Sequence, residues 1–243
     1  MGALITMDRT PPALPRNAAP RADNQDPALF GQTPSQTVGP FFHYGLPWKG
    51  GADLVGGTDI GARLDLFPEE HDVLHLAPPR GPVRGEIIEI VGTVRDGEGV
   101  PVPDAMIEIW GANAAGRYHG AADAREGIPL DPGFIGFGRA AVGADGTYRF
   151  RTVRPGSVPV QIDSNVWQAP HIAVGVFGRG LLKRLVTRIY FADAEHNDRD
   201  PVLELVPRDR RRTLLATRVA DDPPTYRFDI VLRGTNETVF FDV

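Results

Sequence analysis

The sequence predicts a mostly β protein: a β-sandwich with long loops, one short helix and an extended N-terminal arm. Two observations lead to this fold class. The chain of 243 residues holds 28 glycines and 23 prolines, a proportion that favours turns and short strands over long helices. Short apolar runs separated by glycine-containing turns follow one another from about residue 86 onward, and this spacing is typical of sandwiches and barrels.

Strands are expected where apolar and polar residues alternate or where a short apolar run lies between turns. They cover residues 86–94, 105–110, 138–142, 147–153, 171–177, 185–191, 226–232 and 238–241, and one helix is expected over residues 209–219. In the strand at 147–153, alternation places Tyr148 and Phe150 inside and Arg149 and Arg151 in water.

Composition divides the chain into two regions. Residues 1–28 contain several prolines and few large apolar side chains, so they predict a disordered, proline-rich tail. Residues 29–243 are expected to form a single domain. Its first part is an aromatic arm that runs to about residue 48.

Charge and composition exclude several classes of function. The net charge is −5 and there is no cysteine, which argues against nucleic-acid binding and excludes disulfides and thiolate metal sites. No apolar run reaches about 18 residues, so no membrane association is expected, and the cytoplasm is the expected compartment. The arginines at positions 208 and 210–212 are expected on the exposed face of the helix, and His71 and His75 are read as solvated loop residues.

Common catalytic motifs are absent, and the strand at 171–177 is the most informative segment. No serine lies in a Gly-x-Ser-x-Gly frame. A strand that binds a metal would present His-x-His on one face, but His171 is followed at the second position by Ala173. His171 alone is more typical of a hydrogen-bonded core histidine than of a metal ligand.

Five motifs, in order along the chain, resemble the signature sequences of the intradiol ring-cleavage dioxygenases. They are residues 33–40 (TPSQTVGP), 102–110 (VPDAMIEIW), 116–118 (GRY), 130–139 (LDPGFIGFGR) and 148–156 (YRFRTVRPG). The resemblance implies an intradiol-dioxygenase-like β-sandwich and oxidative cleavage of a dihydroxylated aromatic ring. Residues 169–172 (APHI) and 237–242 (ETVFFD) are similar to the iron-free α type of subunit rather than to the catalytic β type.

The resemblance also implies a vestigial site. Catalytic chains of this family hold a non-haem Fe(III) with two tyrosines and two histidines, and phenolates are hard donors that stabilise the ferric state. Tyr118 matches the first tyrosine and His171 the first histidine, whereas Val158 and Ala173 stand at the other two ligand positions. The chain is therefore expected to have no catalytic residue and no metal site of its own.

Two further residues differ from the catalytic pattern. The tryptophan and the arginine that accompany the iron site in catalytic chains match Val160 and Gln168.

A partner is implied for the chemistry itself. The resemblance points to a hetero-oligomer in which a β subunit binds Fe(III) and cleaves protocatechuate (3,4-dihydroxybenzoate) with O₂ to 3-carboxy-cis,cis-muconate, in aromatic catabolism. It also implies that certain residues of this chain line the partner's active site: Thr37, Gly39, Pro40, Phe41 and Arg179. An arginine suits a carboxylate substrate, and glycine allows close backbone approach.

Alternative interpretations stay open. Tyr118 could be a buried tyrosine with no vestigial role, residues 37–41 could be a packing strap, and Arg179 could be a solvated or interface residue. For the whole chain, the alternatives are a self-sufficient catechol-type intradiol dioxygenase with a remodelled site, or a non-enzymatic β-sandwich binding module.

Overall fold

The structure is a computed structural model that describes residues 36–39, 51–56, 82–161 and 164–242. The description below concerns the unit Thr37–Val243. The predicted tail, the domain start at residue 29, Pro40, Phe41 and the histidines at 71 and 75 all lie outside the described residues. Within the described ranges, no helix has the length and apolar character needed to cross a membrane.

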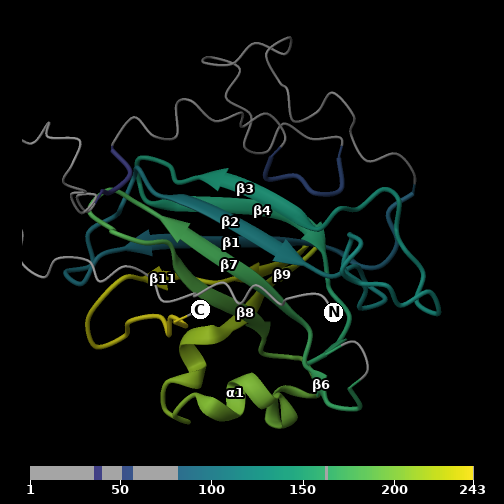
Figure 1. The fold of residues 1–243 in the computed structure, drawn as a ribbon. Coiled ribbons are helices and arrows are strands. Elements are labelled where there is room, and N and C mark those ends of the chain that lie inside the picture. Colours follow the sequence, from purple (N-terminus) through teal and green to yellow (C-terminus); the bar gives the residue numbers. More distant parts are fainter. Residues whose placement is uncertain (1–35, 40–50, 57–81, 162–163, 243) are drawn as a thin grey trace, which may run out of the picture. The chain divides into compact units, whose positions relative to one another are not determined.

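Strands make up most of the regular structure, which confirms the predicted fold class (Figure 1). They are β1 (Ile87–Arg95), β2 (Met106–Gly111), β3 (Phe137–Ala141), β4 (Thr147–Val153), β5 (Val158–Pro159), β6 (Trp167–Gln168), β7 (His171–Phe177), β8 (Leu185–Phe191), β9 (Leu215–Asp221), β10 (Pro224–Arg227) and β11 (Ile230–Val231). The described helical elements are short: α1 (Pro201–Leu205) and the 3₁₀ turns Asn197–Arg199 and Arg211–Leu214.

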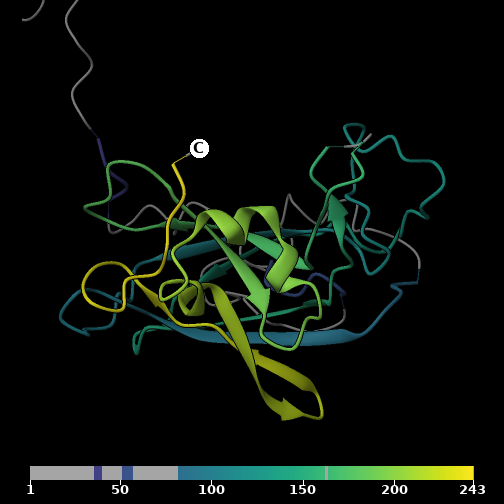
Figure 2. The ribbon, with the colours of Figure 1, turned by 90° about the horizontal axis from the view of Figure 1, so that it is seen from below.

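The main sheet has the strand order β11-β1-β10-β9-β8-β7-β2-β3, and β4 pairs with β1. Strand β9 links the two halves of this order. Its first residues, Leu215 and Ala216, pair with β8, whereas the stretch from Thr217 to Asp221 pairs with β10. In Figure 2, β9 and β10 form a hairpin that projects from the rest of the sheet. Strands β5 and β6 form a separate two-stranded ribbon.

The core lies between the two halves of the sheet. Successive side chains of a strand point to opposite faces, so each strand contributes every second residue. Ile88 and Ile90 from β1, Phe150 from β4 and Ile172 and Val174 from β7 all belong to one buried cluster. As predicted, Tyr148 and Phe150 are buried and Arg149 is exposed. Arg151 is only partly in water, because it pairs with Asp53 at 3.4 Å.

A second, smaller cluster lies on the other face of β8. Tyr190 packs there with Leu203 of α1, with Val206 directly after that helix, and with Leu214. Asp200 precedes α1 and is fully buried. Its Oδ1 accepts hydrogen bonds from the amides of Val202 (2.9 Å) and Leu203 (2.8 Å), so the carboxylate caps the helix. The cap holds α1 beside β8 (Figure 1).

The predicted helix at 209–219 is wrong. Residues 211–214 form a 3₁₀ turn, and β9 begins at Leu215. The arginines do not lie on an exposed helix face: Arg210, Arg211 and Arg212 each donate to a backbone carbonyl, of Glu237, Val206 and Asp209 respectively. These carbonyls orient the guanidinium groups, and Arg212 remains exposed.

The C-terminal strands are shorter than predicted. The strand expected at 226–232 is divided into β10 and β11, and the segment expected as a strand at 238–241 makes only one isolated bridge, between Phe241 and Val186. Thr238 uses its backbone amide and hydroxyl to bond Val231 instead of extending a ladder. The strands at 147–153, 171–177 and 185–191 match the prediction residue for residue.

Removing the Asp200 carboxylate should destabilise the domain more than an ordinary helix cap does. Asp200→Ala leaves the amides of Val202 and Leu203 unpaired, and the amide of Ala169, which Oδ2 also accepts at 2.8 Å, loses its partner too. We expect a loss of at least about 2 kcal/mol in the free energy of unfolding, measured by urea denaturation. The control is Asp198→Ala, at a site whose side chain is 74% exposed. Equal effects of the two substitutions would contradict the role of the cap.

Candidate functional site

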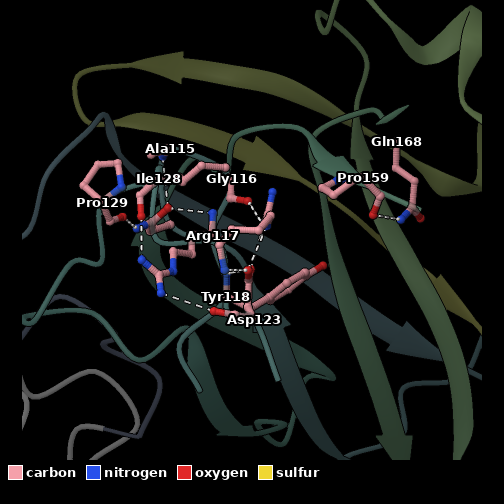
Figure 3. Close-up of polar contacts among 11 residues, drawn as sticks. Ala115, Gly116, Arg117, Tyr118, Asp123, Ile128, Pro129, Pro159 and Gln168 are labelled. Carbon is pink, nitrogen blue, oxygen red and sulfur yellow. Dashed lines mark hydrogen bonds and ion pairs between the residues drawn. The ribbon is translucent and has the colours of Figure 1, made fainter. Parts of the chain in front are cut away.

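The loop that carries Tyr118 is held by hydrogen bonds within itself (Figure 3). Asn113 Oδ1 accepts from the amides of Ala115 (3.1 Å) and Arg117 (2.9 Å), and its Nδ2 donates to the Pro129 carbonyl at 3.0 Å. Arg117 donates to the Ile128 carbonyl at 2.6 Å. Distant parts of the loop between β2 and β3 are therefore tied together, and Tyr118 has a defined place.

An ion pair fixes the residues on either side of Tyr118. Arg125 bonds both oxygens of Asp123, at 2.8 and 2.6 Å, and also donates to the Gly116 carbonyl at 2.7 Å. Asp123 Oδ2 accepts from the Tyr118 amide at 2.9 Å. The bond from Arg125 lowers the pKa of Asp123 to about 2, so the carboxylate stays charged.

Gly116 is required by its surroundings. Its φ is +78°, and a Cβ built on it would lie 2.0 Å from the Ser157 carbonyl oxygen. Only glycine lets the Tyr118 loop approach the segment that leads into β5.

Tyr118 lies in a pocket of about 330 Å³. The lining includes Trp110, whose ring centroid is 5.3 Å from that of Tyr118, together with Asp123, Arg125 and Val160. Burial raises the pKa of Tyr118, and the positive charges of Arg188 and Arg125 oppose that shift. The hydroxyl is a neutral phenol near pH 7.

His171 is buried, with 4% of its surface exposed. Its Nδ1 lies 2.8 Å from the Ala169 carbonyl, which can only accept, so Nδ1 is the protonated nitrogen. Its ring stacks at a tilt on Tyr190, with 5.5 Å between centroids. Burial, with a contribution from the charge of Arg188, lowers the pKa of His171 to about 4. These contacts are those of a hydrogen-bonded core histidine, the interpretation that the sequence of this strand favours over a metal ligand.

The other two predicted ligand positions carry alkyl side chains. Val158 is buried on β5 and lies opposite Gln168 of β6. Ala173 lies on β7, directly opposite Arg188 of β8. The four positions therefore present one phenol, one imidazole and two groups without a donor atom.

Sequence reasoning missed a polar chain beside these positions. Arg188 donates to Gln168 Oε1 at 2.7 Å and to the Tyr190 hydroxyl at 3.2 Å, and that hydroxyl donates to Asp200 Oδ1 at 3.1 Å. Gln168 Nε2 in turn donates to the Pro159 carbonyl at 3.2 Å (Figure 3). Asp200 followed by a proline is a helix-start signal that could have been found in the sequence.

Of the residues predicted to serve a partner, Thr37, Gly39 and Arg179 are described, and Arg179 lies in the turn after β7. Arg179 pairs with Asp104 at 3.0 Å, and 61% of its side chain is exposed. Thr37 donates from its hydroxyl to the Leu181 carbonyl at 2.8 Å. The structure thus brings the described part of the arm, which includes Gly39, to the turn that carries Arg179.

Comparison with known proteins identifies the family. A family model described as Dioxygenase matches residues 65–234. The chain belongs to the intradiol dioxygenases. An α chain of protocatechuate 3,4-dioxygenase from Burkholderia cepacia is 43% identical over 218 residues, which cover 87% of this chain and 98% of that one. A β chain of protocatechuate 3,4-dioxygenase from the same species is 39% identical over 192 residues, covering 77% and 79%. These matches confirm the resemblance drawn from the five motifs.

A solved structure agrees with the fold. The 3-chlorocatechol 1,2-dioxygenase of Rhodococcus opacus 1CP superposes with a TM-score of 0.52 over 63% of this chain and 62% of that one, at 21% identity. This similarity supports the architecture alone. The relatives are dioxygenases, and the family is one of oxidoreductases.

The buried His171 should make folding sensitive to acid. Its pKa is about 4 in the folded chain, against about 6.5 when unfolded. Between these values the unfolded chain binds a proton that the folded chain does not, so the free energy of unfolding falls as the pH falls from 6.5 to 4. We expect His171 to account for about 3 kcal/mol of this loss.

Urea denaturation from pH 7 to 4 measures this contribution as a difference between variants. His171→Gln should flatten the pH dependence, whereas His196→Gln, at an exposed position, should leave it unchanged. An identical slope in wild type and His171→Gln would contradict the assignment.

Proposed function

We propose that the chain is the iron-free α subunit of a protocatechuate 3,4-dioxygenase. The β subunit of the complex would bind Fe(III) and cleave 3,4-dihydroxybenzoate with O₂ to 3-carboxy-cis,cis-muconate, in the cytoplasm. The observation that carries the proposal is the pair Val158 and Ala173, which put alkyl groups at two of the four ligand positions. The similarity to an α chain over nearly its whole length supports the same assignment.

The residues present do not fit ferric iron. The site offers one phenol, from Tyr118, and one imidazole, from His171, whereas Val158 and Ala173 supply no donor atom. It also holds the guanidinium of Arg188, which cannot deprotonate and has no lone pair to donate. Neither the charge nor the coordination number of Fe(III) is met by such a set.

The chain then contributes to catalysis by lining the active site of its partner. In this proposal Thr37, Gly39, Pro40, Phe41 and Arg179 line the β-subunit active site. Two contacts support it. Thr37 bonds the Leu181 carbonyl and so holds the arm at the turn, and Asp104 pairs with the exposed Arg179 of the same turn. A half-exposed arginine is suited to the carboxylate of the substrate.

The isolated chain should bind no more than about a tenth of an equivalent of iron, because two donors are missing. Metal analysis and visible absorption of the purified chain after iron loading provide the measurement. One equivalent of iron with a phenolate charge-transfer band would instead favour the self-sufficient catechol-type enzyme. Absence of any effect of the chain on turnover by a β subunit would favour a binding module.

Arg179→Ala should lower kcat/KM for protocatechuate about tenfold in the assembled complex, equivalent to about 1.4 kcal/mol. The loss should be smaller for catechol, which lacks the carboxylate. Lys183→Ala is the matched control, since Lys183 is an exposed cation four residues away that pairs with Asp242. Light scattering at the assay concentration establishes that the complex is intact. Equal losses on both substrates would assign Arg179 to the interface, and unchanged kinetics would remove it from the active site.

A further inference from the structure

The two strands beneath the vestigial site place an arginine where a ligand is missing. Ala173 and Arg188 are direct partners across β7 and β8, as are His171 and Tyr190. Direct partners in an antiparallel pair project to the same face of the sheet. Arg188 therefore shares one face with His171, and the small Ala173 leaves room for its long side chain.

Hydrogen bonds hold the guanidinium at this position. Arg188 bonds Gln168 Oε1 at 2.7 Å, and Gln168 is the direct partner of Val158 on the β5–β6 ribbon. Arg188 thus connects the two positions that lack a ligand, one on each side. Its charge also acts on both Tyr118 and His171, the two positions that keep a donor.

A buried carboxylate completes the arrangement. Tyr190 accepts from Arg188 at 3.2 Å and donates to Asp200 at 3.1 Å. Asp200 Oδ2 accepts from the Ala169 amide at 2.8 Å, and the Ala169 carbonyl accepts from His171. The chain of bonds leads from the missing ligand positions back to the remaining histidine. It supplies a partner to each polar group it passes.

We propose that the guanidinium of Arg188 is a built-in replacement for the metal cation: it occupies the vestigial site, stabilises it without a metal and excludes a metal from it. A fixed positive charge in a poorly solvated site repels a second cation and is not removed by any accessible pH. Restoring the two lost ligands would therefore be insufficient to restore metal binding.

The test is a set of full-length variants that differ only at position 188. The background is Val158→Tyr with Ala173→His, which restores a set of two phenols and two imidazoles. In it, Arg188 is kept, changed to Ala, or changed to Lys, which retains the charge with less bulk. Each protein is loaded with Fe(II) without air and then oxidised. Bound iron and the phenolate charge-transfer band are measured, and near-UV circular dichroism verifies the fold.

We expect about one equivalent of iron with Arg188→Ala and less than about a tenth with Arg188 kept or replaced by Lys. Equal iron binding with and without Arg188 would overturn the proposal. So would iron binding by the Lys variant, since the charge would then not be the excluding feature. Failure of the Ala variant to bind iron would also overturn it.

A stability measurement tests the other half of the proposal independently. In the otherwise natural chain, Arg188→Ala should lower the unfolding midpoint by about 5 °C, because Gln168 and Tyr190 lose a charged partner. The control is Arg199→Ala, where the side chain is 81% exposed. An unchanged midpoint would show that Arg188 does not stabilise the site. Neither measurement uses a partner subunit, so the outcome is separate from the success of the proposed function.

Discussion

Alternation of side chains along β7 separates the core of this chain from its site, and the rest of the structure depends on that separation. Ile172 and Val174 face the interior between the two halves of the sheet, whereas His171 and Ala173 face outward, toward Tyr190 and α1. A shift of one residue in the pairing with β8 would exchange the two sets. Because the core residues hold the register, the outward residues can change without unfolding the sandwich. A metal site on that face can therefore be lost while the fold is kept.

Buried polar groups beside the four predicted ligand positions find partners within the chain. These partners matter for stability, since an unpaired buried polar group costs about 1–3 kcal/mol. His171 finds its partner in the Ala169 carbonyl. Tyr190 is bonded on both sides, by Arg188 and Asp200. The same carboxylate caps α1, so the helix and the site are stabilised by one group.

How much could be predicted from the sequence depends on how local each signal is. The strands at 147–153 and 171–177 were predicted because each is a continuous apolar or alternating run. Helix α1 was missed because five residues are too few to show a helical period. The segment predicted as a helix at 209–219 is divided between the 3₁₀ turn Arg211–Leu214 and the start of β9 at Leu215. The pair Arg188–Gln168 could not be found, because its partners lie 20 positions apart and meet only through strand pairing. The ligand positions themselves came from the family resemblance.

The length of β7 separates the two regions of the chain on which the proposed function depends. His171 begins the strand, and the turn with Arg179 follows its end at Phe177. At about 3.3 Å per residue, these ends are about 20 Å apart. Arg179, whose partner Asp104 is partly buried, therefore lies far from the outward face at His171. Under the proposed function, Arg179 and the arm at Thr37 act at the active site of another subunit. Substitutions at Arg188 are then expected to leave that contribution unchanged, because the strand between them packs on the core.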